Sequence, residues 1–140
     1  MSKTDSVLKF ARAVCIFGAV FDGLTLLPML FPSIGGLIFG IQNFAPGPDY
    51  RYAMNLSASL MLGWTLLLVW AARRPILREA VLPLTVIVVL GLAAAGVGAV
   101  TSGLIPLKNM MPTFVLQAAV ILLFSIAYAK LRRLEVRPQR

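Results

Sequence analysis

Asp22 is the residue whose type and position in this sequence most plainly suit it to chemistry. It lies inside the apolar stretch 10–31 and is the only acidic residue within any apolar run of the chain. A carboxylate near the centre of a bilayer costs about 2.5–3.5 kcal/mol on insertion scales, so such residues face a bundle interior and usually serve ions, protons or ligands. We therefore expect neighbouring helices to give Asp22 either a polar partner or water.

Polar residues of two other apolar runs are expected at the same depth as Asp22. Asn55 and Ser59 lie four residues apart and share one face of a helix, and Gln117 lies in a later run. At 1.5 Å rise per residue, Asp22, Ser59 and Gln117 each lie about 9–12 Å from the outer ends of their helices. We therefore predict a ligand-binding pocket in the outer half of the bundle, lined by Asp22, Thr25, Asn55, Ser59 and Gln117. The alternative is that these groups bond to one another and only hold the helices together.

Cysteine and histidine usage restricts the chemistry further. Cys15 is the only cysteine, and the chain has no histidine. An intrachain disulfide, a CxxC redox pair, the common zinc sites and His-based acid–base catalysis are therefore excluded. Cys15 itself lies in an apolar run, where a buried, inert thiol is expected. No nucleophile–base pair can be assembled, so the sequence predicts a protein that is not an enzyme and that carries no cofactor or metal.

Composition indicates a membrane protein. Charged residues make up 13% of the 140 residues and the mean hydropathy is +0.89, whereas soluble domains are about 25% charged. Four apolar runs predict transmembrane helices at about 7–31, 52–72, 80–105 and 110–130, because only a helix of this length satisfies its own backbone in hydrocarbon. The predicted fold class is all-α, a four-transmembrane-helix bundle that forms a single membrane domain over 1–140.

The distribution of basic residues predicts the orientation. Most of the 13 lysines and arginines lie in the N-terminal flank, in the C-terminal tail, and after the second run, at Arg73, Arg74 and Arg78. With four spans these three segments fall on one side, so both termini are expected to be cytoplasmic in a multi-pass protein of the inner (plasma) membrane. The net charge of +8 does not indicate nucleic-acid binding, since the basic residues flank apolar segments and line no soluble face.

The links between the runs give further expectations. The outer link 32–51 is apolar from Ile34 to Phe44, which fits an interfacial helix or a loop folded onto the helix ends. Pro75 should end the second helix at the preceding residues, because the residue before a proline avoids the α region. A tight hairpin from Pro106 to Asn109 should make the third and fourth helices antiparallel neighbours.

Two rows of small residues predict close helix packing. Such faces let backbones approach in lipid. Packing within one bundle is the first interpretation, and a seam between two copies of a homo-oligomer is the second. The rows, each spaced by four residues, are Ala11, Cys15, Ala19 and Gly23 in the first run, and Gly91, Ala95, Ala99 and Gly103 in the third.

The second run carries a family resemblance. The stretch from Tyr50 to Leu56, YRYAMNL, followed by ASLMLGW ending at Trp64 and by the exit Arg73-Arg74-Pro75, resembles small four-helix membrane proteins of prokaryotes that have no assigned function. This resemblance covers under a third of the chain and implies a fold but no chemistry.

Three better-known groups of membrane proteins are similar only by analogy. DoxX-like proteins have a similar length and helix count. Small multidrug resistance transporters carry one essential acid in their first helix, where this chain has Asp22, although that family uses Glu. The glutathione-using MAPEG enzymes have an Arg- and Glu-bearing second helix, and here Arg51 and Asn55 lack the glutamate.

Three functions follow from these observations as hypotheses. The first is non-enzymatic binding of a small lipophilic or lipid-like ligand in the outer pocket. The second is proton- or cation-coupled transport that uses Asp22, and the third is a structural or accessory subunit of a membrane complex. The lipid bilayer is the expected partner in all three. Trp64 lies deeper than the aromatic belt, and both a packing role and a pocket-lining role are open for it.

Overall fold

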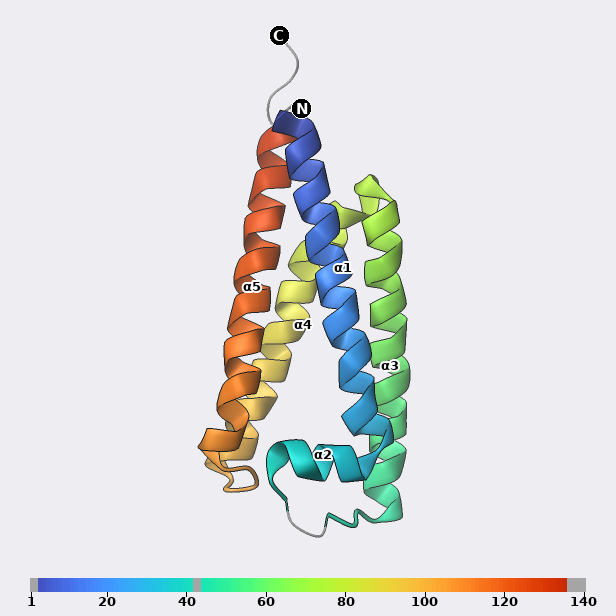
Figure 1. Cartoon of the computed structure of the whole chain (residues 1–140), viewed down its shortest axis with the longest axis vertical. Helices are drawn as coiled ribbons and strands as arrows, with labels where there is room; N and C mark the ends of the chain where they lie inside the picture. The colour runs from blue at the N-terminus through green and yellow to red at the C-terminus, as the bar shows by residue number, and fades with distance from the viewer. Residues whose placement is uncertain (1–2, 42–43, 136–140) are drawn as a thin grey trace.

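The computed structural model describes residues 3–41 and 44–135, which form five helices and no strand (Figure 1). The helices are α1 (Lys3–Leu30), α2 (Pro32–Phe39), α3 (Pro48–Arg73), α4 (Pro75–Thr101) and α5 (Leu107–Glu135). Within α1, α3, α4 and α5, segments of 26 to 28 residues are long and apolar enough to cross a membrane. The prediction of an all-α fold with four helices able to span the bilayer is confirmed.

The helix boundaries differ from the apolar runs because proline and glycine set them. Pro48 and Pro75 lie in the first turns of α3 and α4, several residues before the predicted starts at 52 and 80. A proline at the first helical position has its φ already set for a helix and needs no hydrogen-bond acceptor. Arg74 is extended and ends α3, as expected from Pro75. The helix predicted to reach 105 instead ends at Thr101, and Gly103 follows with a φ of 74°.

The outer link contains the short helix α2, which lies across the end of the bundle between α1 and α5 (Figure 1). It ends at Gly40, whose φ of 69° closes the last turn through a hydrogen bond from the cap to the Gly36 carbonyl. The Asn109 Nδ2 atom of α5 donates to the Phe39 carbonyl at 2.8 Å, which fixes the far end of α2. Residues 42 and 43 of the predicted apolar segment lie outside the described residues.

The four long helices pack as two pairs. The most extensive contacts join α1 to α3 and α4 to α5, and α1 also packs against α5. The expected antiparallel pairing of α4 and α5 is confirmed. Figure 1 shows the two pairs close together near Lys3 and diverging toward α2. The interior near α2 is therefore bounded by both pairs and covered at its end by α2.

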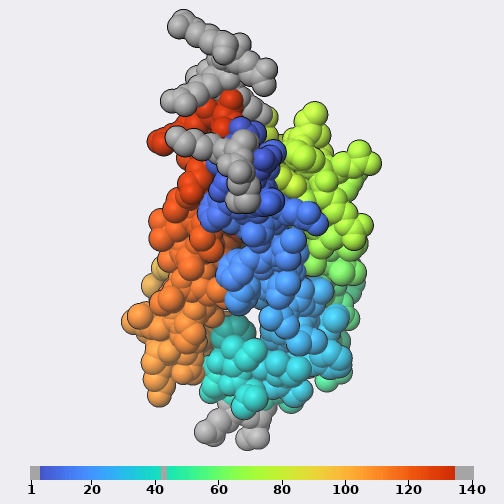
Figure 2. Space-filling model, turned by 45° about the horizontal axis from the view of Figure 1, so that its top comes forward, coloured from blue at the N-terminus to red at the C-terminus, as the bar shows by residue number. Residues whose placement is uncertain are grey.

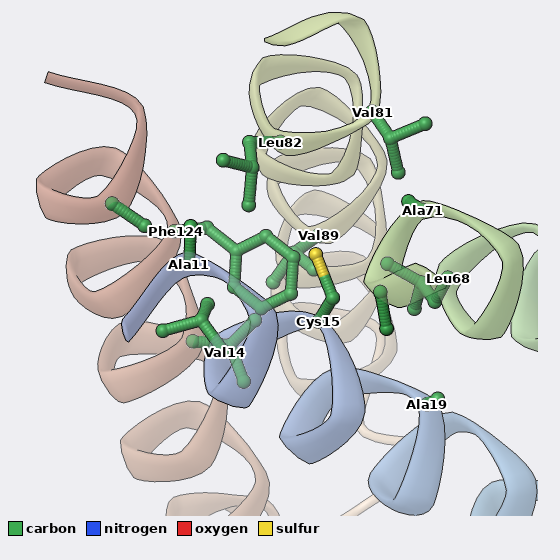
Figure 3. Close-up of a cluster of buried hydrophobic side chains, with 13 residues drawn as sticks. Ala11, Val14, Cys15, Ala19, Leu68, Ala71, Val81, Leu82, Val89 and Phe124 are labelled. Atoms are coloured by element: carbon green, nitrogen blue, oxygen red, sulfur yellow. The ribbon is translucent and has the colours of Figure 1, made fainter. Parts of the chain in front are cut away.

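The buried core lies in the half of the bundle opposite α2. Phe124, Leu68, Leu82 and Cys15 are the largest fully buried side chains, and the Phe124 ring lies beside Cys15 in this cluster (Figure 3). The row of small residues on α1 is confirmed as a packing face, since Ala11, Cys15 and Ala19 are all buried and Gly23 is half-buried.

The row predicted on α4 is wrong as a packing face within this bundle. Gly91 and Ala95 are exposed. The buried glycine is Gly96, where an added Cβ would lie 2.9 Å from the Phe114 ring. The face of α4 that packs against α5 is therefore the face that carries Gly96. The large ring of Phe114 occupies the space that a side chain at Gly96 would need. A seam between two copies along the exposed row stays a prediction.

Arg78 is buried, although the sequence grouped it with the exposed basic flank. Its side chain is 4% exposed. It donates from Nε to the Ala71 carbonyl at 3.0 Å, from Nη2 to the Ala72 carbonyl at 2.7 Å and from Nη1 to the Leu8 carbonyl at 3.1 Å. The guanidinium therefore satisfies carbonyls in the last turn of α3 and joins that turn to α1.

Candidate functional site: an interior polar cluster

Three buried polar atoms from three helices have no hydrogen-bond partner among the described residues. They are Oδ2 of Asp22 in α1, Nε1 of Trp64 in α3 and Oε1 of Gln117 in α5. We call these residues the interior polar cluster. A buried donor or acceptor left unpaired costs about 1–3 kcal/mol, and more when the group is charged. Three such atoms in one small bundle are hydrogen-bonding groups that the other described side chains leave unused, which makes them a candidate site.

The contacts of Gly18 fix the relative heights of α1, α3 and α5. A Cβ at Gly18 would lie 2.6 Å from Phe124 Cζ and 3.4 Å from Leu68 Cδ1, so these residues share one layer. Asp22 and Trp64 each lie four residues from this layer, and Gln117 lies seven residues from it, all toward α2. At 1.5 Å per residue these spacings correspond to about 6 Å and about 10 Å. The interior polar cluster therefore occupies a band about one helical turn deep, directly beyond the packed core.

A second contact supports this register between α1 and α3. A Cβ at Gly23 would lie 3.8 Å from Thr65 Cγ2, so the residues that follow Asp22 and Trp64 are neighbours. Thr25 lies in the same band as Gln117, seven residues from Gly18, and is half-buried. Its Oγ1 donates to the Asp22 carbonyl at 2.7 Å. The hydroxyl hydrogen of Thr25 is therefore used within α1, while its oxygen can still accept a hydrogen bond.

The structure does not bring Asn55 and Ser59 to Asp22. Both are exposed, and the Ser59 Oγ donates to the Asn55 carbonyl of its own helix at 3.0 Å. Ala58 is the buried residue on this part of α3. Because each residue turns a helix by about 100°, Ser59 points away from the face that Ala58 presents. The expectation that Asn55 and Ser59 line an interior pocket with Asp22 is wrong.

Ser59 also does not lie at the depth predicted for it, level with Asp22. The prediction counted from the start of the apolar run, whereas α3 begins four residues earlier. Thr65, not Ser59, lies beside Gly23. Ser59 therefore lies about 9 Å nearer the α2 end than that contact. Trp64, which the sequence left open between packing and pocket lining, occupies the height predicted for Ser59. The sequence feature that indicated a site role for Trp64 was its indole N–H deep in an apolar run, because a buried Trp usually finds a partner for this hydrogen.

Arg51 is not joined to Asp22. It is exposed near the start of α3, and no hydrogen bond or ion pair connects the two side chains in the described part of the chain. The interpretation of Arg51 as a headgroup anchor, and not as a counter-ion, agrees with this position.

The region toward α2 is where a molecule could reach the interior polar cluster. In Figure 2 the surface is hollowed where α1, α2 and α5 meet. The cluster offers two acceptor oxygens, from Asp22 and Gln117, and one donor, from Trp64. A hydroxyl, which both donates and accepts hydrogen bonds, matches all three atoms, and an ammonium, which only donates, matches the two oxygens. Within residues 3–41 and 44–135, no three His, Cys, Asp or Glu side chains come together as metal ligands would.

The resemblance to small four-helix membrane proteins rests on the residues of α3 quoted above and stays a prediction. The chain matches no protein-family model, no curated protein and no solved structure.

Proposed function

We propose that this chain is a non-enzymatic integral membrane protein that binds a small amphiphile between α1, α3 and α5. The observation that carries the proposal is the set of three unpaired buried atoms on Asp22, Trp64 and Gln117. A polar head bonded to these atoms would offset the cost of burying them. The four apolar helices support the membrane location.

The proposed ligand has a head that carries hydrogen-bond donors. Asp22 and Gln117 each present an unpaired acceptor oxygen, at heights along the bundle that differ by about one helical turn, and an ammonium or hydroxyl group can donate to such oxygens. A carboxylate head would meet the Asp22 carboxylate and be repelled, because like charges in a low dielectric interact strongly. The proposal therefore distinguishes amines and alcohols, which bind, from acids, which do not.

The experiment is a binding series with three twelve-carbon amphiphiles: dodecylamine, dodecanol and dodecanoic acid. Affinity is measured by calorimetry on the whole chain in phosphatidylcholine nanodiscs, with empty nanodiscs subtracted. We expect saturable binding of the amine and the alcohol. Asp22→Asn should weaken the amine at least tenfold and the alcohol much less, because it removes the charge but keeps an acceptor oxygen.

A matched pair of amide substitutions provides the control. Gln117→Leu removes an amide from the interior polar cluster, and Asn55→Leu removes one from the exposed face of α3. Only Gln117→Leu should weaken binding. The proposal fails if no amphiphile binds saturably, or if the two amide variants bind equally well.

A further inference from the structure

A groove runs along the outer surface between α1 and α3, at the end of the bundle opposite α2. Its volume is about 270 Å³. Arg12 and Arg73 line the end of the groove that is farther from α2. The rest of the lining is apolar: Ile16, Ala19, Val20, Val69 and Ala72. The groove belongs neither to the interior polar cluster nor to the space beside it, since Ala19 and Ala72 form its floor and are part of the buried core.

The arrangement of the lining matches a molecule with a charged head and a long tail. Arg12 and Val20 are eight residues apart on α1, so the apolar part extends about 12 Å from the basic end. Ile16 is 46% exposed and Val20 is 55% exposed. These exposed side chains belong to a helix long and apolar enough to span a membrane, and in a bilayer such a position faces the acyl chains. The groove therefore opens sideways toward lipid.

The two arginines have charge available for a ligand. Both are exposed, and no hydrogen bond or ion pair joins either side chain to another described residue. They come from different helices that run side by side (Figure 1). Two arginines that line an apolar groove carry the planar, multiple donors from which a phosphate diester accepts hydrogen bonds.

We propose that this groove is a binding site for one anionic phospholipid. The phosphate lies between Arg12 and Arg73, and one acyl chain lies along Ile16, Val20 and Val69. Basic pockets between transmembrane helices are known to bind acidic head groups. The lipid comes from the leaflet at the end that carries Lys3 and Glu135, the opposite end from the ligand proposed above.

The experiment measures lipid binding to the whole chain in detergent by native mass spectrometry. The probes are palmitoyl-oleoyl phosphatidylglycerol, phosphatidylcholine with the same acyl chains, and inorganic phosphate. We expect one phosphatidylglycerol to bind at least tenfold more tightly than phosphatidylcholine. The double variant Arg12→Gln/Arg73→Gln should weaken phosphatidylglycerol by about 30-fold, the ratio expected for two basic groups that each contribute about 1 kcal/mol.

The matched control is Arg132→Gln/Arg133→Gln, which removes two exposed charges near the same end of the bundle but outside the groove. It should change the affinity by less than twofold. The apolar part is tested with Val20→Trp, which fills the groove from an exposed position and should weaken both phospholipids. Equal losses in the two double variants would overturn the proposal, because they would reflect surface charge alone. Competition by inorganic phosphate at concentrations similar to those of the lipid would also overturn it, since it would show a phosphate site without a tail.

Discussion

Arg78 is a buried cation whose three hydrogen bonds all go to backbone carbonyls. Two of these carbonyls belong to Ala71 and Ala72, at the C-terminus of α3, where a helix leaves its last four carbonyls unpaired. The negative end of the helix dipole lies there as well and favours a cation. The guanidinium spreads its donors over three nitrogens, so one arginine reaches carbonyls in both α3 and α1.

Replacing Arg78 should therefore destabilise the chain strongly. Arg78→Met leaves the Ala71 and Ala72 carbonyls at the end of α3 without a donor, whereas the Leu8 carbonyl keeps its hydrogen bond within α1. We expect the free energy of unfolding to fall by about 3 kcal/mol, since each buried unpaired acceptor costs about 1–3 kcal/mol. Arg78→Lys should recover only part of this loss. The measurement is unfolding in a denaturing detergent. The neighbouring Arg74→Met removes an exposed charge and should change stability by less than about 0.5 kcal/mol; a loss similar to that of Arg78→Met would contradict the assignment.

Single residues also show how far the sequence could predict the site. Asp22 and Gln117 were found because a polar group in an apolar run is costly wherever it lies. Ser59 was misplaced because a spacing of four residues shows which side chains share a face, but not which neighbour that face meets. Arg78 was missed because a count of basic residues treats every flank as exposed. Its position in the first turn of α4, where the helix dipole disfavours a cation, was the signal against that reading.

At the level of helices, the contact of α1 with α5 depends on the absence of a side chain at Gly18. A Cβ there would lie 2.6 Å from the ring of Phe124, which is fully buried and has no room to move away. We expect Gly18→Ala to lower the free energy of unfolding by about 1–3 kcal/mol, the cost of overpacking a core. Gly63→Ala is the matched control within α3, because nothing lies within 4 Å of its added Cβ. It should be neutral or stabilising by up to about 1 kcal/mol. Equal effects of the two substitutions in the same unfolding assay would contradict this packing.

The cover formed by α2 depends on one side chain of α5. The amide of Asn109 donates to the Phe39 carbonyl at the end of α2. Asn109→Ala removes this hydrogen bond, worth about 1 kcal/mol, and should raise the hydrogen-exchange rate of the α2 amides by about fivefold. The core amides of α1 around Cys15 should keep their rates and serve as the internal control. Unchanged exchange in α2 would show that its packing on α1 alone holds it in place.

The helices themselves were largely predictable, whereas their ends were not. Length and hydropathy identify the four long helices, because a bilayer requires each segment to satisfy its own backbone. The turns added at Pro48 and Pro75 contain charged residues, so hydropathy does not detect them. The α2 helix is short and apolar, and sequence alone left it open between a helix and a folded loop.

In the molecule as a whole, the tightly packed core and the unpaired polar atoms lie in different halves. The core cluster fills the half opposite α2, and the unpaired atoms of Asp22, Trp64 and Gln117 lie beyond it, toward α2. Both helix ends that carry the termini, Lys3 of α1 and Glu135 of α5, are at the core end (Figure 1). The core thus closes one end of the bundle, and the proposed ligand enters from the other.

The proposed orientation places the core end in the cytoplasm, because the basic segments gather there. Single cysteines introduced at Ser6 and at Ser33, in a Cys15→Ser background, report the two ends. Both native serines are exposed. In intact cells, a membrane-impermeant maleimide should label the cysteine at Ser33 and not the one at Ser6, and permeabilisation should make both react. The opposite labelling pattern would reverse the orientation.

The central claim, that an amphiphile head binds among Asp22, Trp64 and Gln117, is tested most directly by the fluorescence of Trp64. The chain has two tryptophans, and Trp70 is 56% exposed, so Trp70→Phe leaves Trp64 as the reporter. Dodecylamine should shift its emission saturably, and with Asp22→Asn the same shift should need at least ten times more amine. In Trp64→Phe, the remaining Trp70 should show only the gradual change expected from amine entering the bilayer. A Trp64 emission that is unchanged while the amine binds, or that changes equally with Asp22→Asn present, would contradict the account.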